Sequence, residues 1–147
     1  DYLATGDAGV GRAVFNRTCA KCHTLFGEGG TIGPDLTGSG RKKADYVITN
    51  LVDPTATIDQ AYRLTTVITA DGRLYTGFVI KQDDAEITLR MPDAEVKLDM
   101  QKVDEIVTGN KSLMPEGMLN SFTDEEVRDL LRYLQSDTQV APAARAD

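Results

Sequence analysis

The sequence predicts a mainly α-helical fold into which one antiparallel β-sheet is inserted. Apolar residues recur at helical spacing near both ends of the 147-residue chain, and β-branched residues with tight turns fill its middle. A third observation is that every cysteine and histidine falls within five consecutive residues. The first two observations set the architecture, and the third marks where the chemistry lies.

Length and composition are those of one soluble domain with a modest insertion. Hydrophobic residues make up 41% of the chain, which is enough for a packed core, and the formal net charge is −7. An acidic chain argues against nucleic acid as a partner, because phosphate binding needs a basic surface. No apolar run approaches the roughly 20 residues that a membrane span needs. No signal-peptide pattern opens the sequence, so we expect a mature start or an excised domain.

A first helix is expected over residues 7–18. Gly11 and Phe15 lie four apart on it, which places them on one face. A glycine inside a helix costs stability. Its presence here indicates that another part of the backbone approaches closely.

The two cysteines and the single histidine form the pattern Cys19-Ala20-Lys21-Cys22-His23, the C-x-x-C-H pattern of c-type haem attachment. Thiols three positions apart face the same side of a helical turn, where each can add to one haem vinyl group. The adjacent imidazole then lies over the iron as an axial ligand. The motif therefore predicts one covalently attached haem c.

Three other interpretations explain the motif less well. A disulfide between Cys19 and Cys22 leaves the histidine without a role. A thioredoxin-like redox pair expects a βαβ setting, which the flanking residues do not offer. A zinc site takes four ligands, usually Cys or His, and the chain has three such residues in total.

The middle of the chain predicts a β insertion over residues 62–108. A loop over residues 30–40 and a helix over residues 44–52, ended by Asp53-Pro54, precede it. Asp71-Gly72 predicts a hairpin, and Asp83-Asp84 and Pro92-Asp93 predict further turns. Strands are expected over residues 63–69, 74–80, 86–90, 95–98 and 103–107. These features predict an antiparallel sheet or a small barrel resembling an SH3-like module.

A last helix is expected over residues 124–135. Thr123 and Glu126 have the spacing of a capping box, and Phe122 and Val127 that of a hydrophobic staple. Tyr133 lies next to the apolar face of this helix and is placed to cross over Gly11. That face is formed by Val127, Leu130, Leu131 and Leu134.

These motifs resemble the class I cytochrome c fold. The resemblance rests on Gly11, Phe15, the Cys19–His23 motif, Gly33-Pro34-Asp35-Leu36, Leu113-Met114-Pro115 and Tyr133-Leu134. It implies that the terminal helices cross at Gly11, that the Pro34 carbonyl binds the far nitrogen of His23, and that a methionine sulfur lies on the distal side of the iron. With the β insertion, the chain also resembles the haem-binding domains of planctomycetes and verrucomicrobia, which implies extracytoplasmic, periplasmic-type electron transport.

The resemblance divides the chain into four parts. Residues 1–61 would form the first part of the cytochrome core with the attachment motif, and residues 62–108 the insertion. Residues 109–136 would form the second part of the core with the methionine loop, and residues 137–147 a flexible tail. The insertion is interpreted as a docking surface, a haem shield, a dimerisation edge or a solvent-facing decoration.

Four methionines compete for the distal position. Met114 is preferred because it lies in a Gly/Pro-rich loop before the last helix, where the family carries its ligand. Met118 remains the alternative, since a thioether needs only to be within reach of the iron. Met91 and Met100 fall in the strand region, where methionine more often fills a core or lies on the surface.

The predicted function is one-electron transfer between redox partner proteins, without catalysis, with the iron ligated by His23 and Met114. Two alternatives remain: a haem enzyme or gas-binding sensor with an open or labile distal site, and an electron-relay domain of a larger dehydrogenase. The basic run Arg41-Lys42-Lys43 predicts a solvated helix start. Its alternative is a salt bridge to an acidic partner or to a haem propionate.

Overall fold

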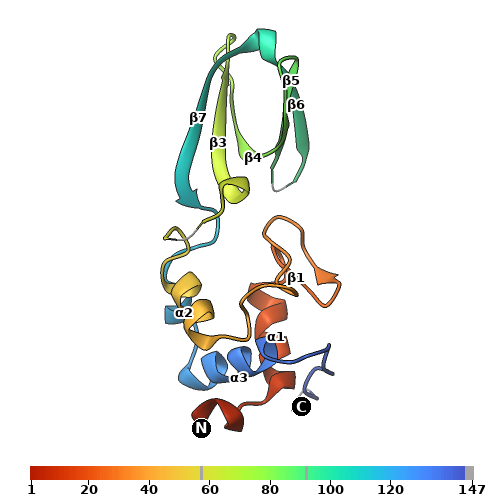
Figure 1. The fold of residues 1–147 in the computed structure, drawn as a ribbon, viewed down its shortest axis with the longest axis vertical. Coiled ribbons are helices and arrows are strands. Elements are labelled where there is room, and N and C mark those ends of the chain that lie inside the picture. The colour runs from red at the N-terminus through yellow and green to blue at the C-terminus, as the bar shows by residue number, and fades with distance from the viewer. Residues whose placement is uncertain (57, 92, 145–147) are drawn as a thin grey trace. The chain divides into compact units, whose positions relative to one another are not determined.

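The computed structural model of the chain describes residues 1–56, 58–91 and 93–144. It divides into two compact units (Figure 1), a helical unit made of Asp1–Pro54 and Pro115–Asp147 and a sheet unit made of Thr55–Met114. The turn expected at Pro92 and the last three residues of the expected tail lie outside the described residues. In the described part of the chain, no helix has the length and apolar character to cross a membrane.

The helical unit is built around three α-helices, among the residues that the structure describes. Its elements are η1 (Tyr2–Thr5), α1 (Ala8–Thr18), β1 (Thr24–Leu25), β2 (Glu28–Gly29), α2 (Ala44–Val52), η4 (Met118–Ser121) and α3 (Asp124–Leu134). The helices expected near both ends of the sequence and over residues 44–52 are all present. Asp7, expected inside the first helix, is instead its N-cap, and its carboxylate accepts from the amides of Gly9 and Val10 at 2.8 and 3.0 Å.

Helices α1 and α3 cross at Gly11, as predicted. A Cβ atom on Gly11 would lie 1.9 Å from the backbone oxygen of Asp129 and 2.8 Å from the Cβ of Tyr133. No side chain larger than hydrogen fits at that distance. The buried side chains around the crossing form the core of the unit and include Val14, Phe15, Leu130, Leu131, Tyr133 and Leu134.

The start of α3 has the predicted capping box. The Glu126 amide donates to Thr123 Oγ1 at 3.2 Å, and the Thr123 amide donates to Glu126 Oε2 at 3.0 Å. Two amides that the first helical turn leaves without partners are thereby satisfied. The helix ends at Leu134, one residue earlier than expected, because Gln135 serves as its C-cap.

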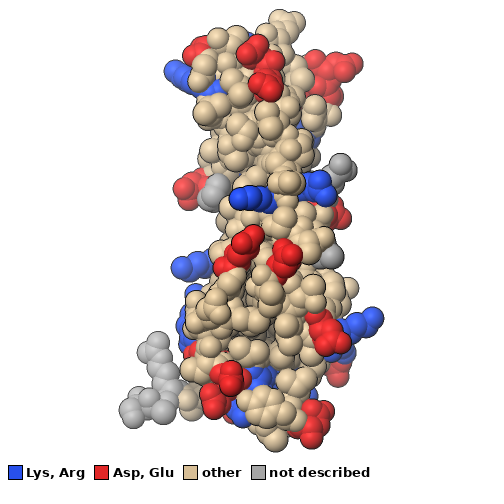
Figure 2. All heavy atoms as spheres, turned by 90° about the vertical axis from the view of Figure 1, so that its left-hand side faces the viewer, with Lys and Arg blue, Asp and Glu red and all other residues tan. Residues whose placement is uncertain are grey.

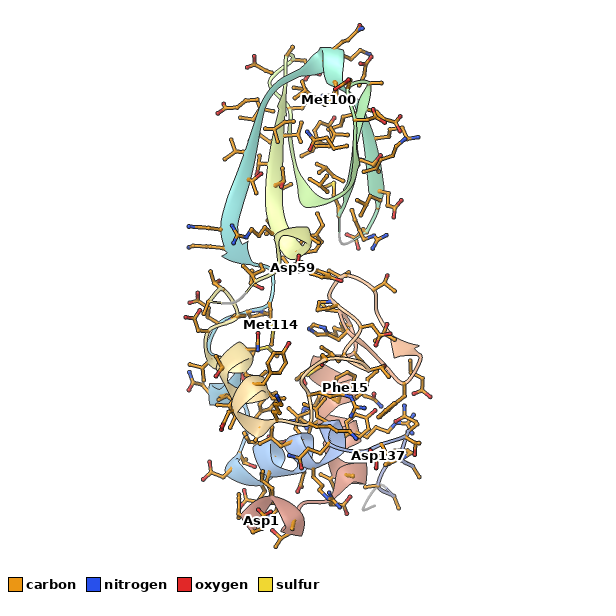
Figure 3. All side chains as sticks on the ribbon, viewed as in Figure 1. Asp1, Phe15, Asp59, Met100, Met114 and Asp137 are labelled. Atoms are coloured by element: carbon orange, nitrogen blue, oxygen red, sulfur yellow. The ribbon has the colours of Figure 1, made fainter. Side chains whose placement is uncertain are left out.

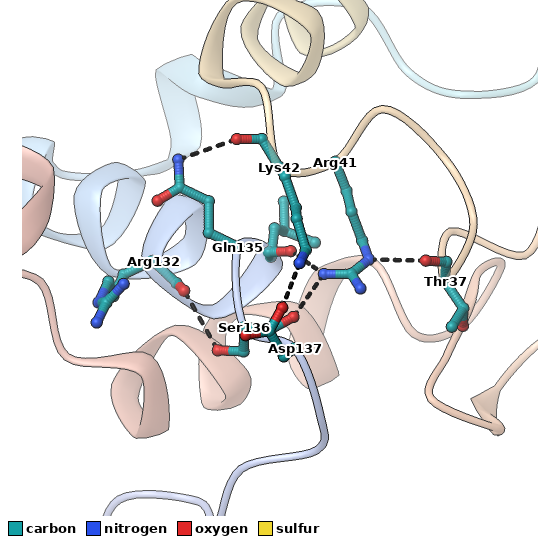
Figure 4. Close-up of polar contacts among 8 residues, drawn as sticks. Thr37, Arg41, Lys42, Arg132, Gln135, Ser136 and Asp137 are labelled. Carbon is teal, nitrogen blue, oxygen red and sulfur yellow. Dashed lines mark hydrogen bonds and ion pairs between the residues drawn. The ribbon is translucent and has the colours of Figure 1, made fainter.

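The end of α3 is held by Arg41, which corrects the expectation of a solvated basic run (Figure 4). Arg41 is only 6% exposed. Its guanidinium donates to the backbone oxygen of Leu134 at the end of the helix. It also donates to the backbone oxygens of Ser136, at 2.7 Å, and of Thr37, at 3.0 Å. A cation at a helix C-terminus is favoured by the helix dipole. Lys42, by contrast, is exposed and pairs with Asp137.

The sheet unit contains five antiparallel strands, among its described residues, in the order β6-β5-β4-β3-β7 (Figure 1). The strands are β3 (Arg63–Thr69), β4 (Leu74–Gln82), β5 (Glu86–Arg90), β6 (Glu95–Asp99) and β7 (Val103–Ser112), with η2 (Gln60–Tyr62) before β3 and η3 (Met100–Lys102) before β7. The sheet is as prominent as the helices, so "mainly α" understates the β content. Strand β7 also continues five residues beyond the predicted end at Val107, because Ser112 pairs with Arg63.

One apolar cluster forms the core of the sheet unit. Val67, Ile87 and Leu89 are fully buried, and partly buried side chains from the other strands and η3 pack against them. In the described residues, β6 pairs with β5 and β7 pairs with β3. In this order β6 and β7 are the edge strands of an antiparallel sheet, which agrees with the first of the two predicted alternatives.

The segment after α3 contacts α1. Arg12 donates to the backbone oxygen of Val140, and a Cβ on Gly9 would lie 2.8 Å from the amide nitrogen of Ala143. Val140, Ala141 and Ala143 of the expected tail therefore lie against α1. On the face drawn in Figure 2, acidic and basic side chains are interspersed rather than gathered into one patch.

Candidate haem-attachment site

The attachment motif forms the turn that ends α1. The amides of Cys19 and Ala20 donate to the Phe15 oxygen at 2.7 and 2.9 Å, and those of Cys22 and His23 donate to the Cys19 oxygen at 3.1 and 2.9 Å. This chain of bonds continues the helical direction through the motif. Both cysteines are free thiols and half-buried, so neither is engaged in a disulfide.

Glycines allow the next loop to fold tightly against the motif. The Gly30 amide donates to the Ala20 oxygen at 2.8 Å, and the Gly33 amide donates to the Cys22 oxygen at 2.7 Å. Gly29 has a φ of +122°, and a Cβ there would lie 2.1 Å from the His23 oxygen. A Cβ on Gly30 would lie 2.2 Å from the Lys21 oxygen. Gly29 and Gly30 are not part of any motif quoted above, although a glycine pair soon after the attachment motif signals close backbone approach.

His23 is oriented by the backbone of Pro34. Its Nδ1 lies 2.8 Å from the Pro34 carbonyl oxygen. A carbonyl oxygen can only accept, so Nδ1 carries a proton and donates it. When Nε2 carries no proton, its lone pair is the one left to bind a metal. Gly33 adjoins the ring, because a Cβ there would lie 2.8 Å from His23 Cε1.

The Cys19 thiol lies in a less polar setting than free cysteine. Burial raises its pKa, a hydrogen bond with Thr18 lowers it, and the nearby Cys22 raises it. The net shift is upward, so Cys19 is a protonated thiol at neutral pH before any thioether forms.

Aromatic rings support the loop that follows the motif. Phe26 and Gly27 have φ values of 51° and 81° and form the two-residue turn between β1 and β2, a position that favours glycine or asparagine. Phe26 is held there by two contacts: its ring packs edge-on to Tyr133 at 6.4 Å, and the Arg41 guanidinium lies 4.8 Å from its centroid. Tyr133 also packs against Phe15 at 5.6 Å. The crossing of α1 and α3 is thus connected to the loop beside His23.

The structure brings Cys19, Cys22, His23 and Pro34 together in the helical unit, whereas Met114 is the last residue of the sheet unit (Figure 3). The Met114 amide donates to Ser112 Oγ at 3.1 Å. Met118 begins η4 of the helical unit. Met100 packs against the apolar core of the sheet, which is one of the two roles expected for it, and Met91 lies beside Gly77.

These residues fit a covalently bound haem. Two free thiols lie three positions apart in the sequence, the spacing of c-type haem attachment. The other ring nitrogen of His23, Nε2, is the one not engaged with Pro34 and would bind the iron. Across residues 1–56, 58–91 and 93–144, no group of three or more His, Cys, Asp or Glu side chains is arranged to hold a metal ion.

Comparison with known proteins agrees with this chemistry. The family model described as Cytochrome c matches residues 9–87, more than half of the chain. A protein named "Cytochrome c" from Arabidopsis thaliana is 52% identical over 44 residues, which is 29% of this chain and 39% of that relative. The chain thus spans about two fifths of the length of the relative it matches. By the family match and the attachment motif, the chain belongs to the cytochrome c family.

Proposed function

We propose that the chain is a mono-haem c-type cytochrome domain that transfers single electrons between two redox partner proteins. The observation that carries the proposal is the 2.8 Å contact between His23 Nδ1 and the Pro34 oxygen, which orients the imidazole in the same motif as two free thiols. Haem-based electron transfer is the general role of the family, whose members are generally carriers and not enzymes. Cys19 and Cys22 would hold the haem through thioether bonds.

Met114 would supply the second axial ligand. His23 and Met114 would hold the iron together, and a thioether ligand would raise the reduction potential of the haem. Two features favour Met114 over Met118: Pro115 follows it and restricts its backbone, and Ser112 binds its amide. Met118 remains the alternative ligand.

We place the electron carrier outside the cytoplasm, in the periplasm or an equivalent compartment, because family members are typically extracytoplasmic. The core would be formed by residues 1–61 and 109–136, and residues 62–108 would be inserted in it. Donor and acceptor would be proteins, and the net charge of −7 would steer the chain towards basic docking surfaces.

The optical spectrum of the purified holoprotein tests the proposal. Sharp low-spin bands, a weak near-infrared sulfur-to-iron band in the ferric state and no response of the ferrous state to carbon monoxide are expected. High-spin bands with ready carbon monoxide binding would contradict it and favour a haem enzyme or gas sensor with an open distal site.

Three variants identify the ligand. Met114→Ala is expected to abolish the sulfur-to-iron band and to allow carbon monoxide to bind. Met91→Ala, in the sheet unit, serves as the matched control and should leave the band unchanged. Loss of the band in Met118→Ala with retention in Met114→Ala would transfer the role to Met118.

A further inference from the structure

Ser112 lies at the end of β7, where the sheet passes into the methionine segment. It is the last residue of the strand and pairs with Arg63 on β3. Its amide donates to Thr55 Oγ1 at 3.2 Å, and its own hydroxyl oxygen accepts from the Met114 amide at 3.1 Å. One residue therefore connects the sheet to the backbone of Met114.

The Ser112 hydroxyl forms a local turn of a kind that serine favours. A serine oxygen that accepts from the amide two residues later fixes the direction of the intervening peptides. Pro115 acts from the other side, because the residue before a proline is restricted to extended conformations. The backbone of Met114 is thus constrained by Ser112 on one side and by Pro115 on the other.

The close packing of β7 on β3 before Ser112 also constrains the methionine segment. A Cβ on Gly109 would lie 2.9 Å from the Leu64 oxygen, so β7 packs closely on β3 just before Ser112. The ladder also contains an irregularity between the pairs Arg63–Ser112 and Thr65–Thr108. Irregularities of this kind re-aim the residues that follow them. The end of the sheet therefore sets the direction in which Leu113 and Met114 leave it.

We infer that Ser112 is a positioning residue for the Met114 thioether. The inference rests on the proposed ligation by Met114. The hydroxyl of Ser112 holds the Met114 amide, so the side chain starts from one backbone conformation instead of several. Removing the hydroxyl leaves the sulfur able to bind but makes its departure from the iron more frequent.

The sharpest test compares Ser112→Val with Ser112→Thr. These two variants have nearly the same shape and are both β-branched, which suits the end of a strand, but only threonine keeps the hydroxyl. The readout is the rate at which added imidazole replaces the methionine in the ferric protein. Ser112→Val is expected to accelerate replacement about fivefold, the factor that corresponds to a net hydrogen bond of about 1 kcal/mol. Ser112→Thr is expected to stay close to the wild type.

Asp99→Ala serves as the control for a generally loosened sheet. Asp99, the last residue of β6, forms the same type of side-chain turn before β7 begins, where it accepts from the Gln101 amide at 2.9 Å. The variant Asp99→Ala is expected to leave the rate at which imidazole replaces the methionine unchanged. Equal rates in Ser112→Val, Ser112→Thr and the wild type would overturn the inference, as would an equal acceleration in Asp99→Ala.

Failure of the inference can be told apart from failure of the proposed function. If Met114→Ala keeps the sulfur-to-iron band, the ligand assignment is wrong and the role of Ser112 falls with it. If Met114→Ala loses the band while Ser112→Val and Ser112→Thr exchange at one rate, the ligand assignment holds and the positioning role is wrong.

Discussion

The imidazole Nδ1 of His23 lies 2.8 Å from the carbonyl oxygen of Pro34. This relationship spans a loop of ten residues that is itself closed by the bonds from Gly30 to Ala20 and from Gly33 to Cys22. The tautomer of the histidine is therefore set by backbone atoms, which no side-chain substitution removes. The position of the His23 ring is instead sensitive to a side chain added at Gly33, which adjoins the ring.

Gly33→Ala tests that sensitivity. The new Cβ would lie 2.8 Å from His23 Cε1 and 3.0 Å from Nδ1, so the ring must move and its bond to Pro34 weakens. A weaker bond at Nδ1 makes the imidazole a poorer donor to ferric iron. We expect the reduction potential of the holoprotein to rise, as measured by spectroelectrochemistry.

Gly38→Ala is the matched control for this substitution, because a Cβ on Gly38 meets no atom within 4 Å. Its potential should equal that of the wild type. Equal potentials in Gly33→Ala and Gly38→Ala would show that the ring position does not depend on the space at Gly33.

Gly11→Ala tests the crossing of α1 and α3. The added Cβ would lie 1.9 Å from the Asp129 oxygen, and a backbone atom cannot turn away as a side chain can. We expect the free energy of unfolding to fall by roughly 3 kcal/mol or more, measured by guanidinium denaturation. Ala13→Ser, on the exposed side of the same helix, should change the unfolding free energy little. A Gly11→Ala variant with an unchanged free energy of unfolding would mean that α1 and α3 can move apart without loss of stability.

Arg41→Met tests the buried cation at the end of α3. The substitution keeps much of the apolar stem but leaves the Leu134 and Ser136 oxygens without their donor. Because hydrogen bonds to a charged group are stronger than neutral ones, we expect Arg41→Met to lower the free energy of unfolding by roughly 3 kcal/mol. Lys42→Met, which breaks only the exposed pair with Asp137, should have little effect. If both variants lost the same free energy of unfolding, the effect would come from the change in net charge and not from the buried hydrogen bonds.

The contrast between Arg41 and its neighbours shows where sequence patterns stop being informative. Local signals were sufficient for α2 at residues 44–52 and for the box of Thr123 and Glu126, because caps and prolines act within one turn. The burial of Arg41 depends on Leu134, 93 positions away, and nothing inside a run of three basic residues distinguishes the one that points inward.

Strand β7 is longer than the sequence predicts for a related reason. Asn110, Lys111 and the glycine before them favour a loop, yet the register pairs Ser112 with Arg63. Long-range pairing overrides local preference in strands more than in helices. Met114 is a second example. The sequence shows that it follows Ser112 by two positions, but it does not show that the Ser112 hydroxyl binds the Met114 amide.

Tyr133→Phe is expected to change how stability depends on pH. Burial raises the pKa of Tyr133, and a hydrogen bond to Gln139 only partly opposes this shift. A phenol with a raised pKa in the folded state stays protonated there, while the unfolded chain ionises from pH about 10 upward. The stability that Tyr133 contributes is therefore fully present below that pH and is lost as the pH rises through the folded pKa.

The free energy of unfolding of the wild type should consequently fall more steeply above pH about 10 than that of Tyr133→Phe. Tyr46→Phe is the control, because Tyr46 is 45% exposed and should leave the slope unchanged. Unfolding curves in denaturant at several pH values between neutrality and the alkaline limit provide the measurement. Parallel slopes for the wild type and Tyr133→Phe would mean that the phenol reaches water in the folded state, and the packing of its ring between Phe15 and Phe26 would then be looser than the centroid distances indicate.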